Sequence, residues 1–220
     1  MEIFQLLKDS LPSLLSGLSV TVEIAVISLI LAVILGIILG IFSISKSKIL
    51  KTISTVYIYI VRGTPLMIQA LFLYFGVGQA LGIRFDPMVA AIITLTVNAT
   101  AYMAEIFRGG IQAVDNGQME AARCLGLSYY KSMRKVILPQ AIKIMVPSIL
   151  NQFIVTLKDT SILSVISIRE LTLSGQIIIA RNFKPLEMYA IVAVMYFIII
   201  TLLTLASRYV ERKLSYGNKR

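Results

Sequence analysis

The sequence predicts an all-α integral membrane protein in which five transmembrane helices form a single domain over residues 1–220. Two observations support this fold class. Of the residues, 57% are hydrophobic and only 15% are charged, whereas soluble domains carry about 25% charged residues. The hydrophobic residues also lie in long stretches without the regular polar positions that a helix needs when one face meets water. We therefore expect lipid to surround most of the chain.

Five segments are long and apolar enough to cross a bilayer, which takes about 20 helical residues. They are residues 18–42, 53–81, 85–107, 136–157 and 186–207. The first exceeds the h-region of a signal peptide, about 7 to 15 residues, so we interpret it as a retained span. In the second, Arg62-Gly63-Thr64-Pro65 predicts a bend, because proline removes a helical hydrogen bond and glycine adds freedom.

The distribution of Lys and Arg predicts the orientation of these spans. If the connector at residues 108–135 is cytoplasmic, 14 Lys and Arg lie inside, counting Lys143 in the first part of the fourth segment, and six lie outside. The positive-inside rule then places the N-terminus outside and the C-terminus in the cytoplasm. The loop at residues 158–185 is too apolar to be a plain aqueous loop. We expect it to dip back or to lie along the outer interface, where protein covers it.

Composition also excludes several classes of function. The net charge of +10 is typical of cytoplasmic loops beside anionic lipid, so we expect no nucleic-acid partner. Zinc sites need clustered Cys and His, and this sequence has no His and only Cys124. We expect no metal and no cofactor bound by this chain. The phosphate-binding pattern G-x-x-x-x-G-K-[ST] does not occur in the sequence, so ATP hydrolysis by this chain is not expected.

The connector between the third and fourth segments contains Gln118-Met-Glu-Ala-Ala-Arg-Cys-Leu-Gly-Leu127 and, after a basic stretch, Val136-Ile-Leu-Pro139. Two adjacent alanines let a short helix approach another backbone closely. Gly126 permits a turn that a side chain would hinder, and Pro139 marks the start of a helix. These features alone favour an ordinary amphipathic loop helix over a helix that makes a mechanical contact.

The spacing of seven connector residues resembles the EAA loop of ABC importer permeases, with Val136 where that family usually has isoleucine: Glu120, Ala121, Ala122, Gly126, Val136, Leu138 and Pro139. Three further stretches are similar to the polar amino acid branch of the family, which takes up histidine, arginine or glutamine: residues 61–66, 104–112 and 157–161. The resemblance implies the type I ABC importer permease fold, five helices with a short cytoplasmic coupling helix, in the plasma or inner membrane.

The resemblance also implies partners. Two permease subunits, identical or paralogous, would surround one pathway, and an extracytoplasmic amino acid-binding protein would deliver the substrate. A separate ABC ATPase subunit, which uses ATP and Mg, would receive the coupling helix. The residues implied in this coupling are Glu120, Ala121, Ala122, Arg123 and Gly126.

Polar residues form a stripe on each of two predicted spans. In the third span Thr94, Asn98, Tyr102 and Glu105 fall within roughly 80° of arc. The fourth span and its extension repeat the same spacing with Ser148, Gln152, Thr156 and Asp159. The two stripes either face each other across a cavity or bind helices together, as polar side chains in membranes commonly do.

We expect Asn98 and Asp159 to contact substrate, because a carboxylate near an amide suits a cationic or zwitterionic ligand. The full substrate-binding prediction is Thr94, Asn98, Tyr102, Thr156, Lys158 and Asp159. Lys158 either receives a substrate carboxylate or extends to the interface as an ordinary snorkelling lysine.

Glu105 is predicted to pair with Arg108, one turn away, or with Arg62 on the second span. This group is either a gate or a structural ion pair. Charged side chains at membrane depth are costly, about 3 kcal/mol on insertion scales, so each needs a partner or a watery cavity.

Together these features predict the permease subunit of an ATP-driven importer for polar, basic amino acids, with glutamine left open. The preference for a basic substrate comes from two acidic groups at membrane depth, Glu105 and Asp159. One alternative is an ion-coupled secondary amino acid transporter that uses the same two residues as ion sites. Another is a noncatalytic scaffold or receptor subunit with structural polar stripes.

Overall fold

The computed structural model describes residues 2–216, with side chains over residues 3–213, and every regular element in this part of the chain is helical. Residue 1 and residues 217–220 of the predicted domain lie outside the described residues. The long helices are α1 (Glu2–Ser43), α2 (Lys48–Arg62), α5 (Pro87–Gln112), α8 (Leu138–Asp159) and α10 (Pro185–Tyr216). The short ones are α3 (Leu66–Leu71), α4 (Gly78–Leu81), α6 (Asn116–Cys124), α7 (Tyr129–Ser132) and α9 (Leu171–Asn182).

Three tighter or wider helical turns join some of these elements. A π-helical turn at Phe72–Val77 links α3 to α4, and another at Met133–Ile137 links α7 to α8. A 3₁₀ helix at Thr160–Ile166 follows α8 directly. Because these turns leave no break in the helical path, α7, its π turn, α8 and the 3₁₀ helix form one continuous rod.

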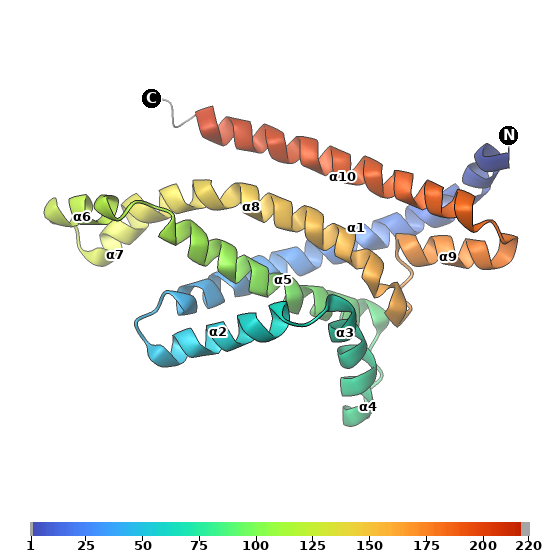
Figure 1. Ribbon diagram of the computed structural model, residues 1–220, viewed down its shortest axis with the longest axis horizontal. Coiled ribbons are helices and arrows are strands. Elements are labelled where there is room, and N and C mark those ends of the chain that lie inside the picture. The colour runs from blue at the N-terminus through green and yellow to red at the C-terminus, as the bar shows by residue number, and fades with distance from the viewer. Residues whose placement is uncertain (1, 217–220) are drawn as a thin grey trace.

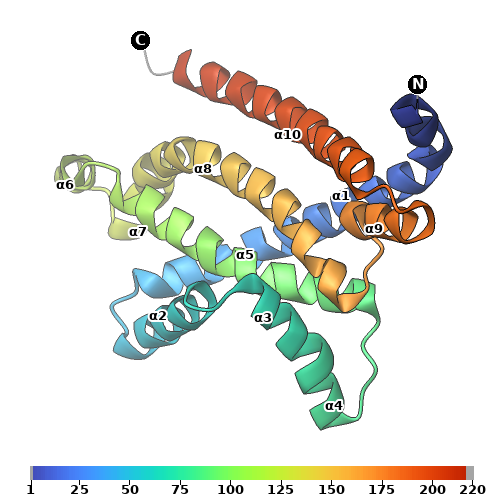
Figure 2. The ribbon, with the colours of Figure 1, turned by 45° about the vertical axis from the view of Figure 1, so that its right-hand side comes forward.

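The molecule is elongated and has two distinct ends (Figure 1). At one end lie α6, α7, the connection between α1 and α2, and the C-terminal end of α10. At the other end lie α9 and the N-terminal end of α1. α3 and α4 project sideways from the bundle, which is clearest in the rotated view (Figure 2).

Four helices among the described residues are long and apolar enough to cross a membrane, and a bent pair of helices gives a fifth span if the pair is counted as one. The four cover Ile3–Ser43, Pro87–Gln112, Tyr129–Ile166 and Pro185–Lys213; the bent pair is Lys48–Arg62 with Leu66–Leu81. The predicted all-α membrane fold is confirmed. The second segment, expected from the sequence at residues 53–81, is broken by 101° where Gly63 and Pro65 predicted a bend.

Helix α1 is longer than the apolar segment that predicted it. α1 starts at Glu2, although the apolar run starts at residue 18, because Pro12 lies inside the helix without ending it. At 42 residues and about 1.5 Å per residue, α1 is roughly twice as long as the hydrocarbon layer is thick. Part of it therefore extends beyond the hydrocarbon.

The contact between α1 and α5 depends on small residues. Gly36 and Gly40 are four residues apart on one face of α1, against Met103 and Phe107 of α5. A Cβ at Gly40 would stand 2.9 Å from the Cβ of Phe107, and one at Gly36 would collide with the Cβ of Met103. Ala32 lies fully buried in the same contact. Small residues spaced in this way let two backbones approach closely in lipid, where packing replaces the hydrophobic effect.

Residues 158–185, expected from the sequence to dip back or to follow the outer interface, form the end of α8, the 3₁₀ helix and α9. Leu163 and Ile166 of the 3₁₀ helix are fully buried and pack in one core cluster with Ile24 of α1 and Leu95 of α5. The apolar residues of this connection are therefore explained by packing against the bundle.

Glu170 fixes the start of α9. Its fully buried carboxylate accepts the backbone N–H groups of Thr172 at 2.8 Å and Leu173 at 2.7 Å, and the hydroxyl of Tyr196 on α10 at 2.9 Å. Burial raises the pKa of Glu170 above its ordinary value, while these hydrogen bonds act in the opposite direction. The carboxylate thus satisfies the free amides of a helix N-terminus and ties α9 to α10.

The close approach of α1 to α5 can be tested with two glycines. Gly36→Ala places a methyl group against Met103, and such overpacking costs about 1–3 kcal/mol. Gly109→Ala on α5 meets nothing within 4 Å and removes a helix-weakening glycine, a gain of about 1 kcal/mol. Thermal unfolding of the purified protein in detergent should show a lower midpoint for Gly36→Ala and an equal or higher one for Gly109→Ala. Equal midpoints for Gly36→Ala and the unsubstituted protein would contradict this packing.

Candidate functional site

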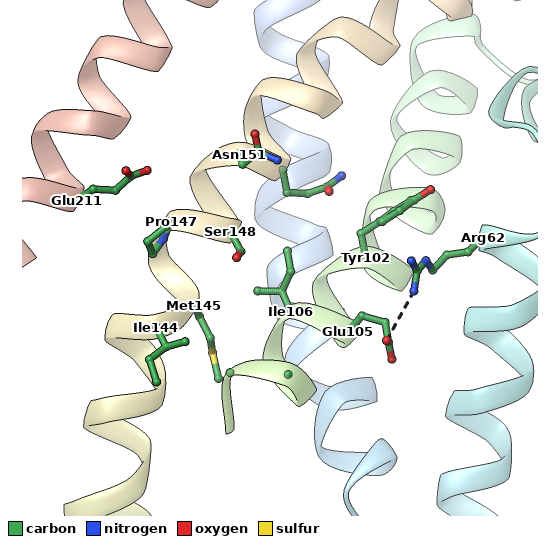
Figure 3. Close-up of a pocket in the computed structure, with 13 residues that line it drawn as sticks. Arg62, Tyr102, Glu105, Ile106, Ile144, Met145, Pro147, Ser148, Asn151 and Glu211 are labelled. Carbon is green, nitrogen blue, oxygen red and sulfur yellow. Dashed lines mark ion pairs between the residues drawn. The ribbon is translucent and has the colours of Figure 1, made fainter. Parts of the chain in front are cut away.

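A cavity of about 750 Å³ lies between α5, α8 and α10, with a residue of α2 at one side (Figure 3). Tyr102 and Glu105 of the α5 stripe line it, as do Ser148 and Gln152 of the α8 stripe. The structure thus brings parts of both stripes to one cavity. Asn151 and Glu211, which the sequence analysis did not single out, also line it.

A second cavity of about 630 Å³ lies on the α2 side of α5. Arg62, Tyr102 and Glu105 line both cavities and therefore form the wall between them. The second cavity also has Lys51, Thr55, Tyr59 and Arg108 in its lining, together with Ser43, Ile58 and Gly63.

The charged residues in this wall are paired unequally. Arg108 donates from Nε and Nη2 to the two oxygens of Glu105, each at 2.9 Å. Arg62 Nη1 is 3.6 Å from Glu105 Oε2, and the Arg62 Cζ atom lies 5.2 Å from the ring centroid of Tyr102. Glu105 is thus held closely by an arginine of its own helix and more loosely by one of α2. Both predicted pairings are present at once.

Asn98 and Thr94 lie beside the break between α2 and α3. Asn98 is 7% exposed and its Nδ2 donates to Gln69 Oε1 of α3 at 3.1 Å. Gln69 Nε2 in turn donates to the carbonyls of Val61 at 2.7 Å and Thr64 at 3.0 Å. Thr94 donates to its own helix, at the Ala90 carbonyl, and lines an apolar cavity of about 430 Å³ together with Gln69.

The sequence analysis missed Gln69. The available signal was an amide side chain in an apolar run, four residues after the proline that breaks the helix.

The remaining predicted substrate residues lie farther along α8. Thr156 is buried, and its Oγ1 accepts from Gln152 Nε2 at 3.4 Å, so it connects with the cavity only through that residue. Lys158 is exposed and Asp159 half-buried at the end of α8. Neither lines any of the three cavities described above.

The connector that carries the EAA pattern forms α6, which stands at one end of the molecule (Figure 1). Asp115 caps this helix by accepting the backbone N–H of Gly117 at 2.8 Å. Ala122 is 4% exposed and faces the bundle, whereas Leu125, just past the helix, is 84% exposed. Gly126 follows with a φ of +80°, a left-handed conformation that favours glycine. Among the implied coupling residues, Glu120, Ala121, Arg123 and Gly126 are all exposed.

α6 is attached to α8 through both polar and apolar contacts. Gln140 Nε2 on α8 donates to Gln118 Oε1 on α6 at 3.3 Å. Met119 packs with Val114 and Ile137 in a cluster that also contains Met145 of α8. Within the described residues, no group of three or more His, Cys, Asp or Glu could hold a metal ion.

The chain resembles several transport proteins over most of its length. Residues 32–216 match the family described as "Binding-protein-dependent transport system inner membrane component". The glutamine transport system permease protein GlnP of Escherichia coli (strain K12) is 39% identical over 206 residues, or 93% of this chain and 94% of that protein. The arginine transport system permease protein ArtQ of Bacillus subtilis (strain 168) is 39% identical over 204 residues, 93% of each chain.

Solved structures agree with these relatives. A chain in the crystal structure of an amino acid ABC transporter with histidines superposes with a TM-score of 0.92 at 37% identity, covering 97% of this chain and 99% of that one. A chain of the MetNI methionine ABC transporter, at 21% identity, has a TM-score of 0.78 and shares the fold. The type I ABC importer permease fold implied by the sequence resemblance is confirmed. This multi-pass membrane protein therefore belongs to the family of binding-protein-dependent transport system inner membrane components, the permease subunits of ABC importers.

Proposed function

We propose that this chain is the permease subunit of an ATP-driven importer for polar, basic amino acids, coupled through α6 to a separate ATPase. The observation that carries this proposal is α6 itself. It stands at the end of the molecule and exposes Glu120 and Leu125, while Ala122 anchors it on the bundle. An exposed short helix with an apolar tip suits a groove in a partner protein.

The attachment of α6 supports a coupling role. Gln118 and Met119 join it to the first turns of α8, and Met145 of α8 packs on Gly110 of α5. Met145 and Gly110 both line the larger cavity. If nucleotide binding to the ATPase displaced α6, the displacement would therefore reach the cavity wall through α8. Such a connection would let nucleotide shift the bundle between two conformations.

The partners of this subunit follow from its family and its sequence. Because the phosphate-binding pattern is missing from this sequence, we assign ATP and Mg to a separate ABC ATPase subunit. A second permease subunit, identical or paralogous, completes the pathway, and an extracytoplasmic binding protein delivers the amino acid. The relatives named above belong to binding-protein-dependent and ABC systems, which argues against the ion-coupled alternative.

We place the α6 end of the molecule in the cytoplasm, with the N-terminus outside and the C-terminus inside. Basic residues support this orientation, because Lys46 of the α1–α2 connection, Lys48 at the start of α2 and Arg123 of α6 lie at the same end (Figure 1). Lys and Arg accumulate on the cytoplasmic side of membrane proteins.

The substrate proposal depends on acidic and amide groups along α5 and α8. We keep Asn98, Asp159, Thr94, Tyr102, Thr156 and Lys158 as substrate contacts, with Tyr102 at the wall of both cavities. Asp159 lies at the end of α8 opposite to α6, where a cation that enters from outside would meet it first. The relatives support a polar amino acid as the substrate, since two of them are named for glutamine and arginine transport, and the arginine relative agrees with a basic one.

The orientation can be tested with Cys124, which is exposed on α6 and is the single cysteine of the chain. A membrane-impermeant maleimide should label it in inside-out vesicles and leave it unlabelled in right-side-out vesicles. As a control, Lys8→Cys in a Cys124→Ser background should label from the opposite side. The reverse pattern would contradict the proposed orientation.

The coupling role of α6 can be tested at Gly126, where φ is +80° and an added Cβ would meet nothing within 4 Å. Gly126→Val adds only backbone strain, about 1–3 kcal/mol, and should reorient α6 and lower copurification of the ATPase at least about tenfold. Gly126→Asn tolerates this conformation and should retain the partner. Undiminished copurification of Gly126→Val, or of a chain lacking residues 120–126, would argue against coupling through α6.

The role of Asp159 can be tested by the substrate preference of the reconstituted complex. A charge-assisted contact contributes about 1.5–3 kcal/mol, so Asp159→Asn should reduce the preference for L-arginine over L-glutamine about tenfold or more. Asp115→Asn, a capping position where asparagine serves equally well, should leave uptake unchanged. An unaltered preference in Asp159→Asn would remove this residue from the site.

A further inference from the structure

The smaller of the two polar cavities carries an excess of positive charge. Its lining contains Lys51, Arg62 and Arg108 but only one carboxylate, that of Glu105. Lys51 forms no ion pair within the part of the chain that the structure describes. Three cations around one anion leave the cavity with a net positive charge, which attracts a further negative group.

The available positive charge is that of Arg62. Both oxygens of Glu105 already accept hydrogen bonds from Arg108, each at 2.9 Å. Arg62 lies 3.6 Å from the same carboxylate, beyond the distance of a hydrogen bond. If the Arg62 guanidinium turned to another anion, Glu105 would keep its two hydrogen bonds from Arg108. The loss of the longer Arg62–Glu105 contact would therefore cost little free energy.

The position of Arg62 makes it accessible from two sides. It is the last residue of α2, directly before the break, and 44% of its side chain is exposed. It lines both cavities, and the close-up shows its guanidinium beside Tyr102, between α2 and the α5 helix (Figure 3). The Tyr102 ring attracts the Arg62 guanidinium through its π face, which leaves the N–H donors of Arg62 available for another partner.

We infer that Arg62 binds the carboxylate of the transported amino acid at the wall between the two cavities, with Lys51 assisting on the α2 side. This inference rests on the proposed import of amino acids. A planar guanidinium matches a carboxylate with two parallel hydrogen bonds. The rest of the same substrate would extend into the larger cavity, which Asn151 and Gln152 also line.

This role differs from that of a structural ion pair in a measurable way. If Arg62 and Glu105 only held α2 to α5, neutralising either one would have the same effect, and exchanging the two residues would restore function. If Arg62 binds substrate, Glu105 competes with the substrate carboxylate. Neutralising Glu105 would then preserve or strengthen binding, whereas neutralising Arg62 would weaken it.

The test measures binding of radiolabelled L-arginine to the purified permease–ATPase complex by equilibrium dialysis, with unlabelled L-arginine or L-argininamide as competitor. The unsubstituted complex should bind L-arginine at least about tenfold more tightly than the amide, the factor expected for one lost charge-assisted contact. Arg62→Gln should reduce this ratio to about twofold or less. Arg62→Lys keeps the positive charge but lacks the paired N–H donors of the guanidinium, so it should give an intermediate value. Glu105→Gln should retain the full ratio.

Lys48→Gln serves as the matched control, because Lys48 is also an exposed lysine of α2 but lines neither cavity. Its ratio should equal that of the unsubstituted complex, and thermal unfolding of each variant verifies the fold.

Equal losses in Arg62→Gln and Glu105→Gln, restored by the exchange Arg62→Glu with Glu105→Arg, would overturn the inference, as would an unchanged ratio in Arg62→Gln. Such results would leave amino acid import itself intact. If neither L-arginine nor L-glutamine bound the unsubstituted complex or entered ATP-loaded proteoliposomes, the proposed function would fail first.

Discussion

One constraint governs the break in the second span: hydrocarbon offers no hydrogen-bond partner for a backbone carbonyl, so the protein itself must supply one wherever a helix is interrupted. Pro65 ends the helical ladder, and the 101° bend leaves carbonyls near the end of α2 without partners from a continuing helix. Gln69 supplies two donors, to Val61 and Thr64, and the hydroxyl of Thr64 donates to the Ile60 carbonyl at 2.9 Å. A buried carbonyl without a partner costs several kcal/mol in lipid. The hydrogen bonds from Gln69 and Thr64 offset this cost at the break.

The break determines the geometry of the site. Arg62 is the last residue of α2, directly before the break, and it lines both cavities. Asn98 of α5 holds Gln69 from the opposite side, so the stripe that lines the cavity with Tyr102 also stabilises the break one turn away. One helical face of α5 thus combines a structural task and a cavity-lining task.

The sequence predicted the fold well where the signal was local or periodic. The lengths of the apolar runs identified the spans, Gly63 and Pro65 indicated the bend, and the spacing around Glu120 identified α6. The role of Gln69 could not be predicted, because it depends on carbonyls that are exposed only once the chain bends. The stripes fixed which residues share a helical face, but not which part of each face meets a cavity. That depends on how α5 and α8 cross, so Asp159 ended outside the cavities while Tyr102 lines two.

Alternating access requires some contacts that persist and others that change, and the packing separates the two kinds. The α1–α5 contact is made at Gly36 and Gly40, where backbones touch and any slide would bring larger side chains into collision. The α5–α8 contact near α6 is made instead by Met145 over Gly110, an unbranched and flexible side chain that can follow a shift. The π-helical turn at Met133–Ile137 lies directly before the start of α8, and such turns often mark functional sites within helices. The bundle is therefore firm where α1 supports α5 and compliant where α6 is attached, which places the movable wall of the cavity on the α8 side.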